Sequence, residues 1–235
     1  MKDIQEIPLA KLVLMKPQSA GVFEKYNLDF CCRGKQSLSQ VLEGNDKEMT
    51  MITNELNILF ADGDEMVKNI FEDYSLCNLI DHIINTHHRY VKENGNLILG
   101  HLEKVAQKHG ERHPEMIEVA SLFKITLRDL EQHMIKEEII LFPRIKTLET
   151  NISEDDTEGI NISTTIKVME TEHEIAGDEM YAIRELTNNY TPPLDACTTY
   201  KLSYEELRLF EIDLHQHVHL ENNILFPKAL KLKRK

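Results

Sequence analysis

Two segments of the chain place the same chemically capable side chains in the same frame. They read HMIKEEIILFP, starting at His133, and HVHLENNILFP, starting at His217. In each segment a glutamate, Glu137 or Glu221, follows the histidine by four residues, and Leu-Phe-Pro ends the segment. Residues four apart lie on one face of an α-helix, one turn from each other. Each segment therefore predicts a helix that directs one imidazole and one carboxylate toward the same point.

A fainter repeat adds one histidine from each of two other segments. His88 aligns with His173, at nearly the same separation along the chain as the two segments above. Buried imidazoles and carboxylates need a counter-charge, which a metal ion supplies. Six protein ligands are too many for one tetrahedral zinc ion, but they suit two iron ions bridged by the two glutamates. His87 is the alternative to its neighbour His88 as a ligand.

Long helices must position these six side chains. Apolar residues recur at helical spacing in four long segments, and strand signals are nearly absent. The expected helices cover residues 76–105, about 115–143, 163–187 and, from a capping box at Ser203, 203–230. We therefore predict an all-α fold with two parts. A small helical domain, residues 1–62, precedes an up-down-up-down four-helix bundle, residues 75–235, and the boundary is expected near residues 61–74.

The Leu-Phe-Pro sequence predicts a local feature beside the expected metal site. Proline inside a helix removes a backbone hydrogen bond and kinks or ends the helix. Pro143 and Pro227 each lie shortly after a predicted ligand. A kink there would close one end of the bundle over the metals, and the preceding phenylalanines, Phe142 and Phe226, would help to exclude water.

A second candidate site is the sequence DFCCRG, which contains the adjacent cysteines Cys31 and Cys32. Neighbouring Cα atoms are ~3.8 Å apart, which is below the usual range for a disulfide, so no structural disulfide framework is indicated. One interpretation is a reactive or metal-associated dithiol, whose thiolate character Arg33 and a nearby helix terminus would shift. The other is a pair of small buried side chains at a helix end that Gly34 caps.

Composition excludes several classes of function. The net charge of −13 would repel a phosphate backbone, so we expect no nucleic-acid partner. No apolar run approaches the ~20 residues of a membrane helix, and the N-terminus lacks the apolar core of a secretory signal. Because no disulfide framework is indicated, a reducing cytoplasm is the expected location.

These residues together resemble a known family. The predicted bundle is similar to a hemerythrin-type domain, and nearly the whole chain resembles the RIC family, di-iron proteins for the repair of iron centres. The segments that carry the resemblance are YNLDFCCRGKQSL, HMIKEEIILFP, METEHEIAG, TNNYTPPLDACTTY and HVHLENNILFP. The resemblance implies a di-iron centre with the ligands His88, His133, Glu137, His173, His217 and Glu221. It also implies that Cys31 and Cys32, in the small N-terminal domain, assist the reaction.

The same resemblance implies a role in the response to nitrosative and oxidative stress. Members of the family are associated with restoring damaged iron–sulfur proteins, by iron donation or by nitric oxide chemistry at the di-iron centre. Nitric oxide and dioxygen are then the expected small ligands, and whether the reaction is enzymatic stays open. The alternative is a hemerythrin-like protein that binds or senses these gases without repair. The linker near residues 61–74 is long enough for two chains to exchange domains, which would give a homodimer.

Overall fold

The computed structural model describes residues 3–61, 70–150 and 162–232 of the 235-residue chain. Over these ranges the secondary structure is helical and includes no β-strand, which confirms the all-α prediction. None of the described helices combines the length and the apolar character that crossing a membrane requires.

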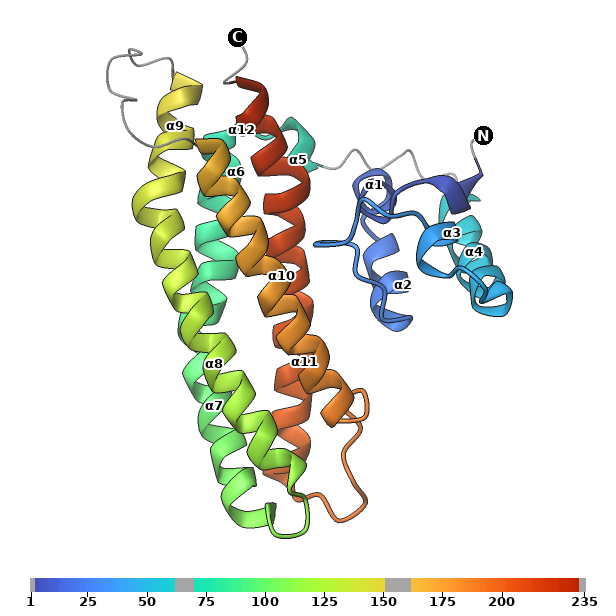
Figure 1. The fold of residues 1–235 in the computed structure, drawn as a ribbon, viewed down its shortest axis with the longest axis vertical. Helices are drawn as coiled ribbons and strands as arrows, with labels where there is room; N and C mark the ends of the chain where they lie inside the picture. Colours follow the sequence, from blue (N-terminus) through green and yellow to red (C-terminus); the bar gives the residue numbers. More distant parts are fainter. Residues whose placement is uncertain (1–2, 62–69, 151–161, 233–235) are drawn as a thin grey trace.

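Four long helical rods form an antiparallel bundle (Figure 1), as the up-down-up-down prediction required. The loops that join the first rod to the second and the third rod to the fourth lie at the same end of the bundle. The first rod is α6 (Leu76–Ile83), η2 (Ile84–His88) and α7 (Arg89–His109); the second is α8 (Glu115–Lys136), η3 (Glu137–Leu141) and α9 (Phe142–Thr150); the third is α10 (Ile162–Leu186); the fourth is α11 (Thr198–Leu220), η5 (Glu221–Leu225) and α12 (Phe226–Leu232).

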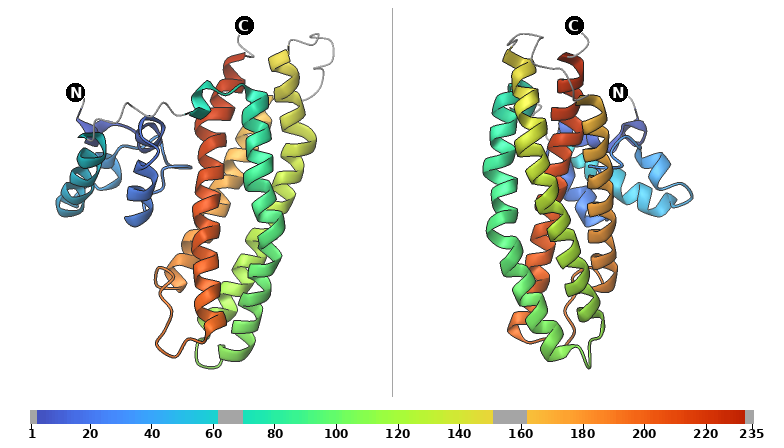
Figure 2. Two further views of the ribbon diagram at one scale, coloured as in Figure 1. Left: turned by 180° about the vertical axis from the view of Figure 1, so that it is seen from behind. Right: turned by 60° about the vertical axis from the view of Figure 1, so that its left-hand side comes forward.

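A smaller unit of short helices lies beside the bundle (Figure 2). Its elements are η1 (Ile4–Glu6), α1 (Leu9–Met15), α2 (Ser19–Lys25), α3 (Leu38–Val41) and α4 (Asp46–Ala61), and the short helix α5 (Ile70–Asp73) precedes the first rod. Ser37 and Gln40 form a capping box at the start of α3. The predicted boundary near residues 61–74 falls mostly on residues 62–69, which lie outside the described residues.

Charged contacts join the smaller unit to the bundle. Arg184 on α10 donates to both carboxylate oxygens of Glu211 on α11, from Nε at 3.2 and 3.0 Å and from Nη2 at 2.5 Å. The same guanidinium donates to Asn27 of the smaller unit and lies 3.6 Å from Glu24. On α11, His215 Nδ1 lies 2.6 Å from a Glu24 oxygen. The docked position therefore depends on a largely buried ionic network, in which charge-assisted hydrogen bonds are strong and directional.

Three rods contain a π-helical turn beside the predicted ligands. In η2, η3 and η5 the backbone N–H of the following residue donates to a carbonyl five residues back, not four. These bonds run from Arg89 to Ile84, from Phe142 to Glu137 and from Phe226 to Glu221. The hydrogen bond of a π-turn spans one residue more than that of an α-helical turn, and such turns are common at functional sites.

The predicted end of the second helix at about residue 143 is too early, whereas the fourth helix was correctly predicted to run past Pro227 to about residue 230. The helices continue past Pro143 to Thr150 and past Pro227 to Leu232. A proline inside a helix needs a gap in the hydrogen-bond ladder, and the π-turn before each proline supplies it.

The predicted start of the fourth helix at Ser203 is also wrong. The helix begins at Thr198, and the Ser203 hydroxyl lies inside it and donates to the Tyr200 carbonyl. Tyr200 and Tyr204 are both buried, so packing extends the helix by more than one turn beyond the capping-box pattern.

The apolar core of the bundle is divided along the rods. On the first rod Ile83 belongs to one buried cluster and Val91 to the other; on the third rod Met169 and Ala176 are divided in the same way. The residues between the two clusters include the predicted ligands. The core thus holds these polar side chains in a layer with apolar packing on both sides, where water is scarce.

Candidate metal centre

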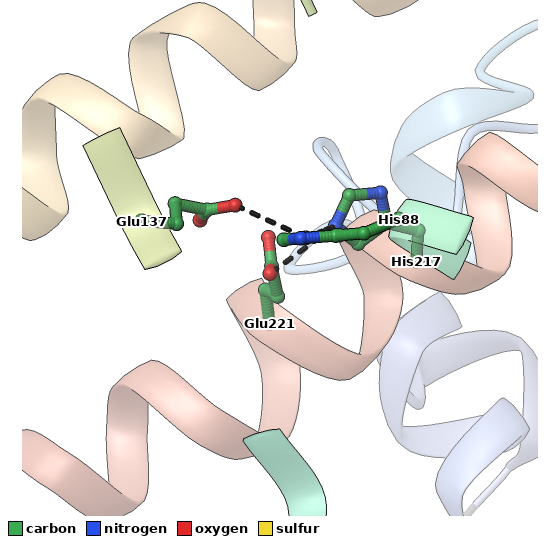
Figure 3. A group of neighbouring side chains, drawn as sticks. All are labelled: His88, Glu137, His217 and Glu221. Carbon is green, nitrogen blue, oxygen red and sulfur yellow. Dashed lines mark hydrogen bonds and ion pairs between the residues drawn. The ribbon is translucent and has the colours of Figure 1, made fainter. Parts of the chain in front are cut away.

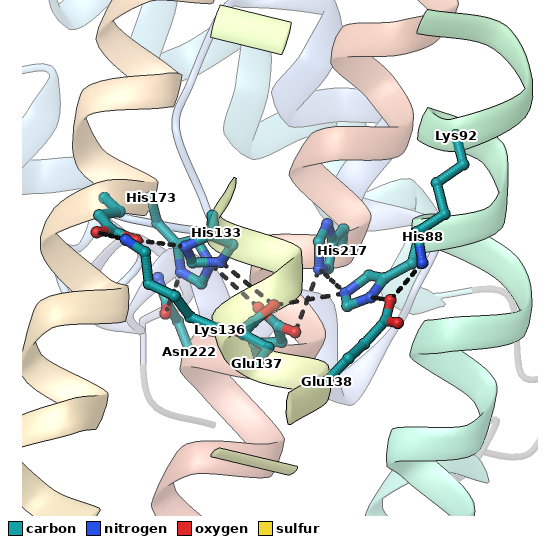
Figure 4. A network of polar contacts seen from close by, with 11 residues as sticks. His88, Lys92, His133, Lys136, Glu137, Glu138, His173, His217 and Asn222 are labelled. Carbon is teal, nitrogen blue, oxygen red and sulfur yellow. Dashed lines mark hydrogen bonds and ion pairs between the residues drawn. The ribbon is translucent and has the colours of Figure 1, made fainter. Parts of the chain in front are cut away.

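The six predicted ligands converge between the rods of the bundle. Figure 4 shows five of them, His88, His133, Glu137, His173 and His217, and Figure 3 shows the sixth, Glu221. All four rods contribute: His88 ends η2, His133 lies on α8, Glu137 begins η3, His173 lies on α10, His217 lies on α11 and Glu221 begins η5. None of the six is more than 2% exposed. The structure therefore brings together every residue that the repeat selected.

The six side chains form two groups that share both glutamates. The His88 group contains His88, His217, Glu137 and Glu221 (Figure 3), and the His133 group contains His133, His173, Glu137 and Glu221. Within each group, one nitrogen or oxygen atom per residue lies within 4.8 Å of the others. Two groups with two shared carboxylates are the arrangement that a pair of bridged metal ions needs.

The distances within the His88 group are short. The Nε2 atoms of His88 and His217 are 3.2 Å apart. Glu137 Oε2 lies 3.4 Å from His88 Nε2, and Glu221 Oε1 lies 3.2 Å from His217 Nε2.

The His133 group repeats this geometry. The Nε2 atoms of His133 and His173 are 2.9 Å apart. Glu137 Oε2 also lies 3.3 Å from His133 Nε2, and Glu221 Oε2 lies 3.0 Å from His173 Nε2. Glu221 thus directs one oxygen toward each group, whereas Glu137 directs the same oxygen toward both.

These donors fit metal ions. Two ligand atoms at right angles about an ion, each ~2.1 Å from it, are ~3 Å apart, which matches the separations between the imidazole nitrogens. The carboxylates of Glu137 and Glu221 are buried and accept no hydrogen bond from the described residues. A buried carboxylate without a donor is costly unless a cation neutralises it. The nitrogen-rich mixture of imidazole and carboxylate is one that iron accepts.

Burial and mutual repulsion act on the two carboxylates. Burial raises the pKa of Glu137 to about 7, and the charge of Glu221 adds to the rise. Burial acts on Glu221 in the same direction, but the imidazoles of His217 and His173 outweigh it and hold the pKa of Glu221 well below its usual range. Near neutral pH, Glu137 therefore holds a proton for part of the time, and a bound cation would displace that proton.

Three of the four imidazoles meet an acceptor at their outer nitrogen. Nδ1 of His88 lies 2.7 Å from Glu138, Nδ1 of His133 lies 2.9 Å from Glu172, and Nδ1 of His173 lies 2.9 Å from Asn222. An acceptor at Nδ1 keeps the ring proton there and leaves the Nε2 lone pair directed inward. These contacts prepare the imidazoles to bind metal.

Lysines hold two of these acceptors in place. Lys92 donates to Glu138 Oε1 at 2.6 Å, and Lys136 donates to Glu172. Each lysine neutralises a carboxylate that would otherwise add negative charge next to the ligand layer.

His87, the alternative ligand, belongs to neither group. Its Nδ1 lies 2.9 Å from Asp213 Oδ1, and its ring lies parallel to that of His217, with ring centroids 5.7 Å apart. The geometry therefore favours His88 over His87.

The two phenylalanines of the repeated segment cover the site. The ring of Phe142 stacks on His88 at a centroid distance of 5.7 Å, and the ring of Phe226 stacks on His173 at 6.1 Å. Both rings are buried. They remove water from one side of the ligand layer, in the way that the sequence predicted.

One opening reaches the His133 group. A cavity of about 270 Å³ lies between α8 and α10, and its lining includes His133, His173 and the Lys136–Glu172 pair. A diatomic molecule is small enough to use this space.

Cys31 and Cys32 lie in the loop between α2 and α3, with their Sγ atoms 3.9 Å apart. Asp29 Oδ1 accepts from the backbone N–H of both cysteines at 2.9 Å and lies 3.2 Å from Cys31 Sγ. The interpretation of a helix end capped by Gly34 is wrong. Gly34 instead allows the backbone at residue 34 to lie close to the Phe30 backbone, because a Cβ at residue 34 would be 2.1 Å from the Phe30 carbonyl oxygen.

The interpretation in which Arg33 shifts the thiolate character of the dithiol is not supported at Cys31. Arg33 pairs with Asp178 at 3.1 Å, on the surface. The Cys32 thiol, burial and the charge of Asp29 raise the pKa of Cys31 well above its usual value. Cys31 is therefore a protonated thiol near neutral pH.

The cysteine loop contacts the bundle close to the predicted metal ligands. Asn223 in η5 donates to the Cys31 carbonyl at 3.1 Å. Cys32 Sγ faces Gly177 of α10, which lies one helical turn after His173. Both cysteines line a cavity of about 630 Å³ between the smaller unit and the bundle. The dithiol is thus placed beside the two rods that supply His173 and Glu221.

Sequence reasoning did not identify Asn222 as an acceptor. The signal was present, because Asn222 is the counterpart of Glu138 in the same repeat that relates Glu221 to Glu137. Lys92 and Lys136 were also missed, and no repeat marks them, since neither has a basic counterpart in the second half.

Comparisons with known proteins agree with this arrangement. Residues 79–229 match the hemerythrin HHE cation binding domain, and residues 5–59 match a domain of unknown function, DUF542. Relatives include the iron-sulfur cluster repair protein YtfE of Citrobacter koseri, which is 34% identical over 97% of this chain and 98% of its own length. The YtfE proteins of Shigella boydii and Escherichia fergusonii are each 34% identical over 95% of this chain and 96% of their own length.

Proposed function

Because the chain belongs to the hemerythrin HHE cation-binding family, and within it is related to the YtfE proteins, we propose that it repairs iron–sulfur clusters damaged by nitric oxide or oxidants. The observation that carries this proposal is the pair of buried groups with two shared carboxylates, Glu137 and Glu221, whose oxygens accept no hydrogen bond from the described residues. We propose that these groups hold two iron ions per chain.

The chain's own residues have distinct roles in this proposal. His88, His133, His173 and His217 would hold the ions through their Nε2 atoms, which face one another in pairs. Glu137 and Glu221, which belong to both groups, would hold them through carboxylate oxygens. Phe142 and Phe226 exclude water on one side, and the cavity beside His133 admits a small ligand. When bound, iron would supply ligand-exchange and redox chemistry, with nitric oxide or dioxygen as the small ligand.

Iron is also the cargo in this proposal. A protein that rebuilds clusters must release iron to a damaged iron–sulfur protein, so its ions have to be exchangeable. Cys31 and Cys32 are proposed to assist that transfer, because they line the cavity that separates the smaller unit from the rods carrying the ligands. The location proposed for this reaction is the cytoplasm, where free thiols persist.

A gas-binding or gas-sensing protein without repair activity is the alternative. The buried site and its cavity would serve either function. The dithiol unit docked beside the site favours repair, because reversible binding of a gas needs no thiol.

The proposal is tested by iron content and by iron transfer. We expect protein purified without oxygen to hold about two irons per chain and to rebuild a cluster on an apo-acceptor protein. His88→Ala should lose iron, because it removes a buried ligand. His101→Ala is the matched control, since His101 pairs with Glu206 away from the site and should keep its iron.

The outcomes separate the two functions. Zinc in place of iron, or unchanged iron in His88→Ala, would contradict the di-iron proposal. Iron that is bound tightly, reacts with nitric oxide and is not transferred to the acceptor protein would support the gas-sensing function. Replacement of both cysteines should leave the iron spectrum intact and impair the transfer.

A further inference from the structure

The two halves of the bundle have the same inward ligands but different outer residues. In the repeat that relates Glu137 to Glu221, Glu138 on the second rod corresponds to Asn222 on the fourth. In the repeat that relates His88 to His173, His87 on the first rod corresponds to Glu172 on the third. A carboxylate in one half is therefore an amide or an imidazole in the other.

His88 and His173 both keep an acceptor in spite of this difference. Glu138 accepts from His88 at 2.7 Å, and its counterpart Asn222 accepts from His173 at 2.9 Å. An amide oxygen thus substitutes for a carboxylate at this position.

His133 and His217 differ in the surroundings of their Nδ1 atoms. Nδ1 of His133 meets Glu172 at 2.9 Å. Nδ1 of His217 is buried and has no hydrogen-bond partner among the described residues. His87 occupies the position that corresponds to Glu172 in the repeat. Its ring lies parallel to the His217 ring. Its own Nδ1 lies within hydrogen-bond distance of Asp213. His87 covers the face of His217 but does not accept its proton.

This difference affects metal binding directly. A neutral imidazole that offers Nε2 to a metal carries its proton on Nδ1. An acceptor at Nδ1 orients the ring and makes Nε2 a stronger ligand, and its loss costs ~10–100-fold in metal affinity. His217 lacks that support, whereas both imidazoles of the His133 group have it.

We infer that the two ions are held unequally and that the ion of the His88 group is the one released first. This inference rests on the proposed function, in which exchangeable iron is required. His87 is then a positioning residue, since the absence of an acceptor at residue 87 makes one site labile. The His133 group, with acceptors at both imidazoles, retains its ion for longer.

The test follows iron release to a coloured ferrous chelator in excess. Wild-type protein loaded to two irons should release them in two phases of equal amplitude, with rates that differ by ~10-fold or more. In His87→Gln, a neutral amide of the same reach as Glu172 supplies an oxygen to His217 and can still donate to Asp213. We expect the fast phase to slow by ~10-fold and the slow phase to stay unchanged.

Glu172→Leu is the matched variant in the other half. It removes the acceptor of His133, so the slow phase should accelerate until the two phases approach one another. This variant tests the inference without depending on the fold of His87→Gln. Circular dichroism and iron content before mixing establish that each variant is folded and loaded.

Three results would overturn the inference. They are a single phase for both wild-type ions, an unchanged fast phase in folded His87→Gln, and an unchanged slow phase in Glu172→Leu. Chelation needs no iron–sulfur acceptor, so any of these would leave the proposed repair function standing. Failure of the wild-type protein to bind iron would remove both proposals together.

Discussion

At the scale of single residues, a repeated motif predicted the six side chains that the structure brings together, but it marked only some of the residues that hydrogen-bond to them. His133 and Glu137 were found because the same pair occurs again at a fixed offset. Glu172 has no carboxylate counterpart in the repeat, and its contact with His133 depends on how α8 and α10 pack. When a pair of side chains that meet across two helices occurs only once, neither helix contains a repeat that would reveal the contact.

Arg184 provides a prediction at this scale. Arg184 forms an ion pair with Glu211, and the two side chains are 7% and 3% exposed, respectively. Arg184→Met would leave the Glu211 carboxylate buried with the Tyr190 hydroxyl as its remaining donor. We expect the free energy of unfolding to fall by ~3–5 kcal/mol, measured by denaturant titration.

The matched control is Arg208→Met, which breaks an exposed pair with Glu205 on the same bundle. Exposed pairs contribute ~0–1 kcal/mol, so this variant should remain close to wild type. Equal losses in the two variants would show that burial does not govern the strength of the Arg184 pair.

At the scale of elements, apolar periodicity predicted which segments are helical and the approximate span of each. It did not predict the π-turns η2, η3 and η5, because one residue more in a turn hardly changes a pattern read over many residues. It also misplaced the start of α11, where the helix, with buried Tyr200, begins before the capping-box pattern at Ser203. Helix boundaries are set by tertiary packing, which a local pattern cannot express.

Gly95 gives a prediction about how α7 packs on α8. A Cβ at Gly95 would lie 2.4 Å from Leu127 Cδ1, which is buried in the core. A Cβ at Gly100, on the same helix, meets nothing within 4 Å. Gly100→Ala should stabilise by ~0.5–1 kcal/mol through helix propensity.

Gly95→Ala should show no such gain, because displaced packing offsets the propensity and overpacking costs ~1–3 kcal/mol. The melting temperature should therefore rise in Gly100→Ala and should not rise in Gly95→Ala. Parallel increases would mean that Leu127 yields freely and that α7 and α8 are not in tight contact.

At the scale of the whole molecule, the sequence could not say whether the cysteines face the bundle. That placement depends on contacts between residues far apart in the chain, such as Arg184 with Asn27 and Asn223 with Cys31. Each of these residues is unremarkable where it stands in the sequence. Only the folded chain shows that the dithiol loop rests on η5, next to Glu221.

Removal of iron should destabilise the whole bundle. The residues proposed to bind the ions come from all four rods, and a ligand present at 100 times its dissociation constant stabilises the folded state by ~2.7 kcal/mol. For a chain of this size we expect the melting temperature to fall by ~5 °C or more after chelation. Thermal unfolding followed by circular dichroism measures the change.

The His88→Ala protein is the control for this measurement. Because it should hold less iron, the chelator should change its melting temperature less than that of the wild type. An identical melting temperature for wild-type protein with and without iron would show that the empty ligand layer is already stable.

The π-turns have a consequence for changes in chain length. An α-helix turns by ~100° per residue, so a residue added to or removed from a regular helix rotates everything beyond it. A π-turn absorbs one additional residue within a single wide turn, so Phe142 and Ile145, which follow η3, are still directed into the core. Removal of one residue from η3 should therefore be tolerated better than removal of one residue from the regular helix α8, because the wide turn can close to an ordinary one.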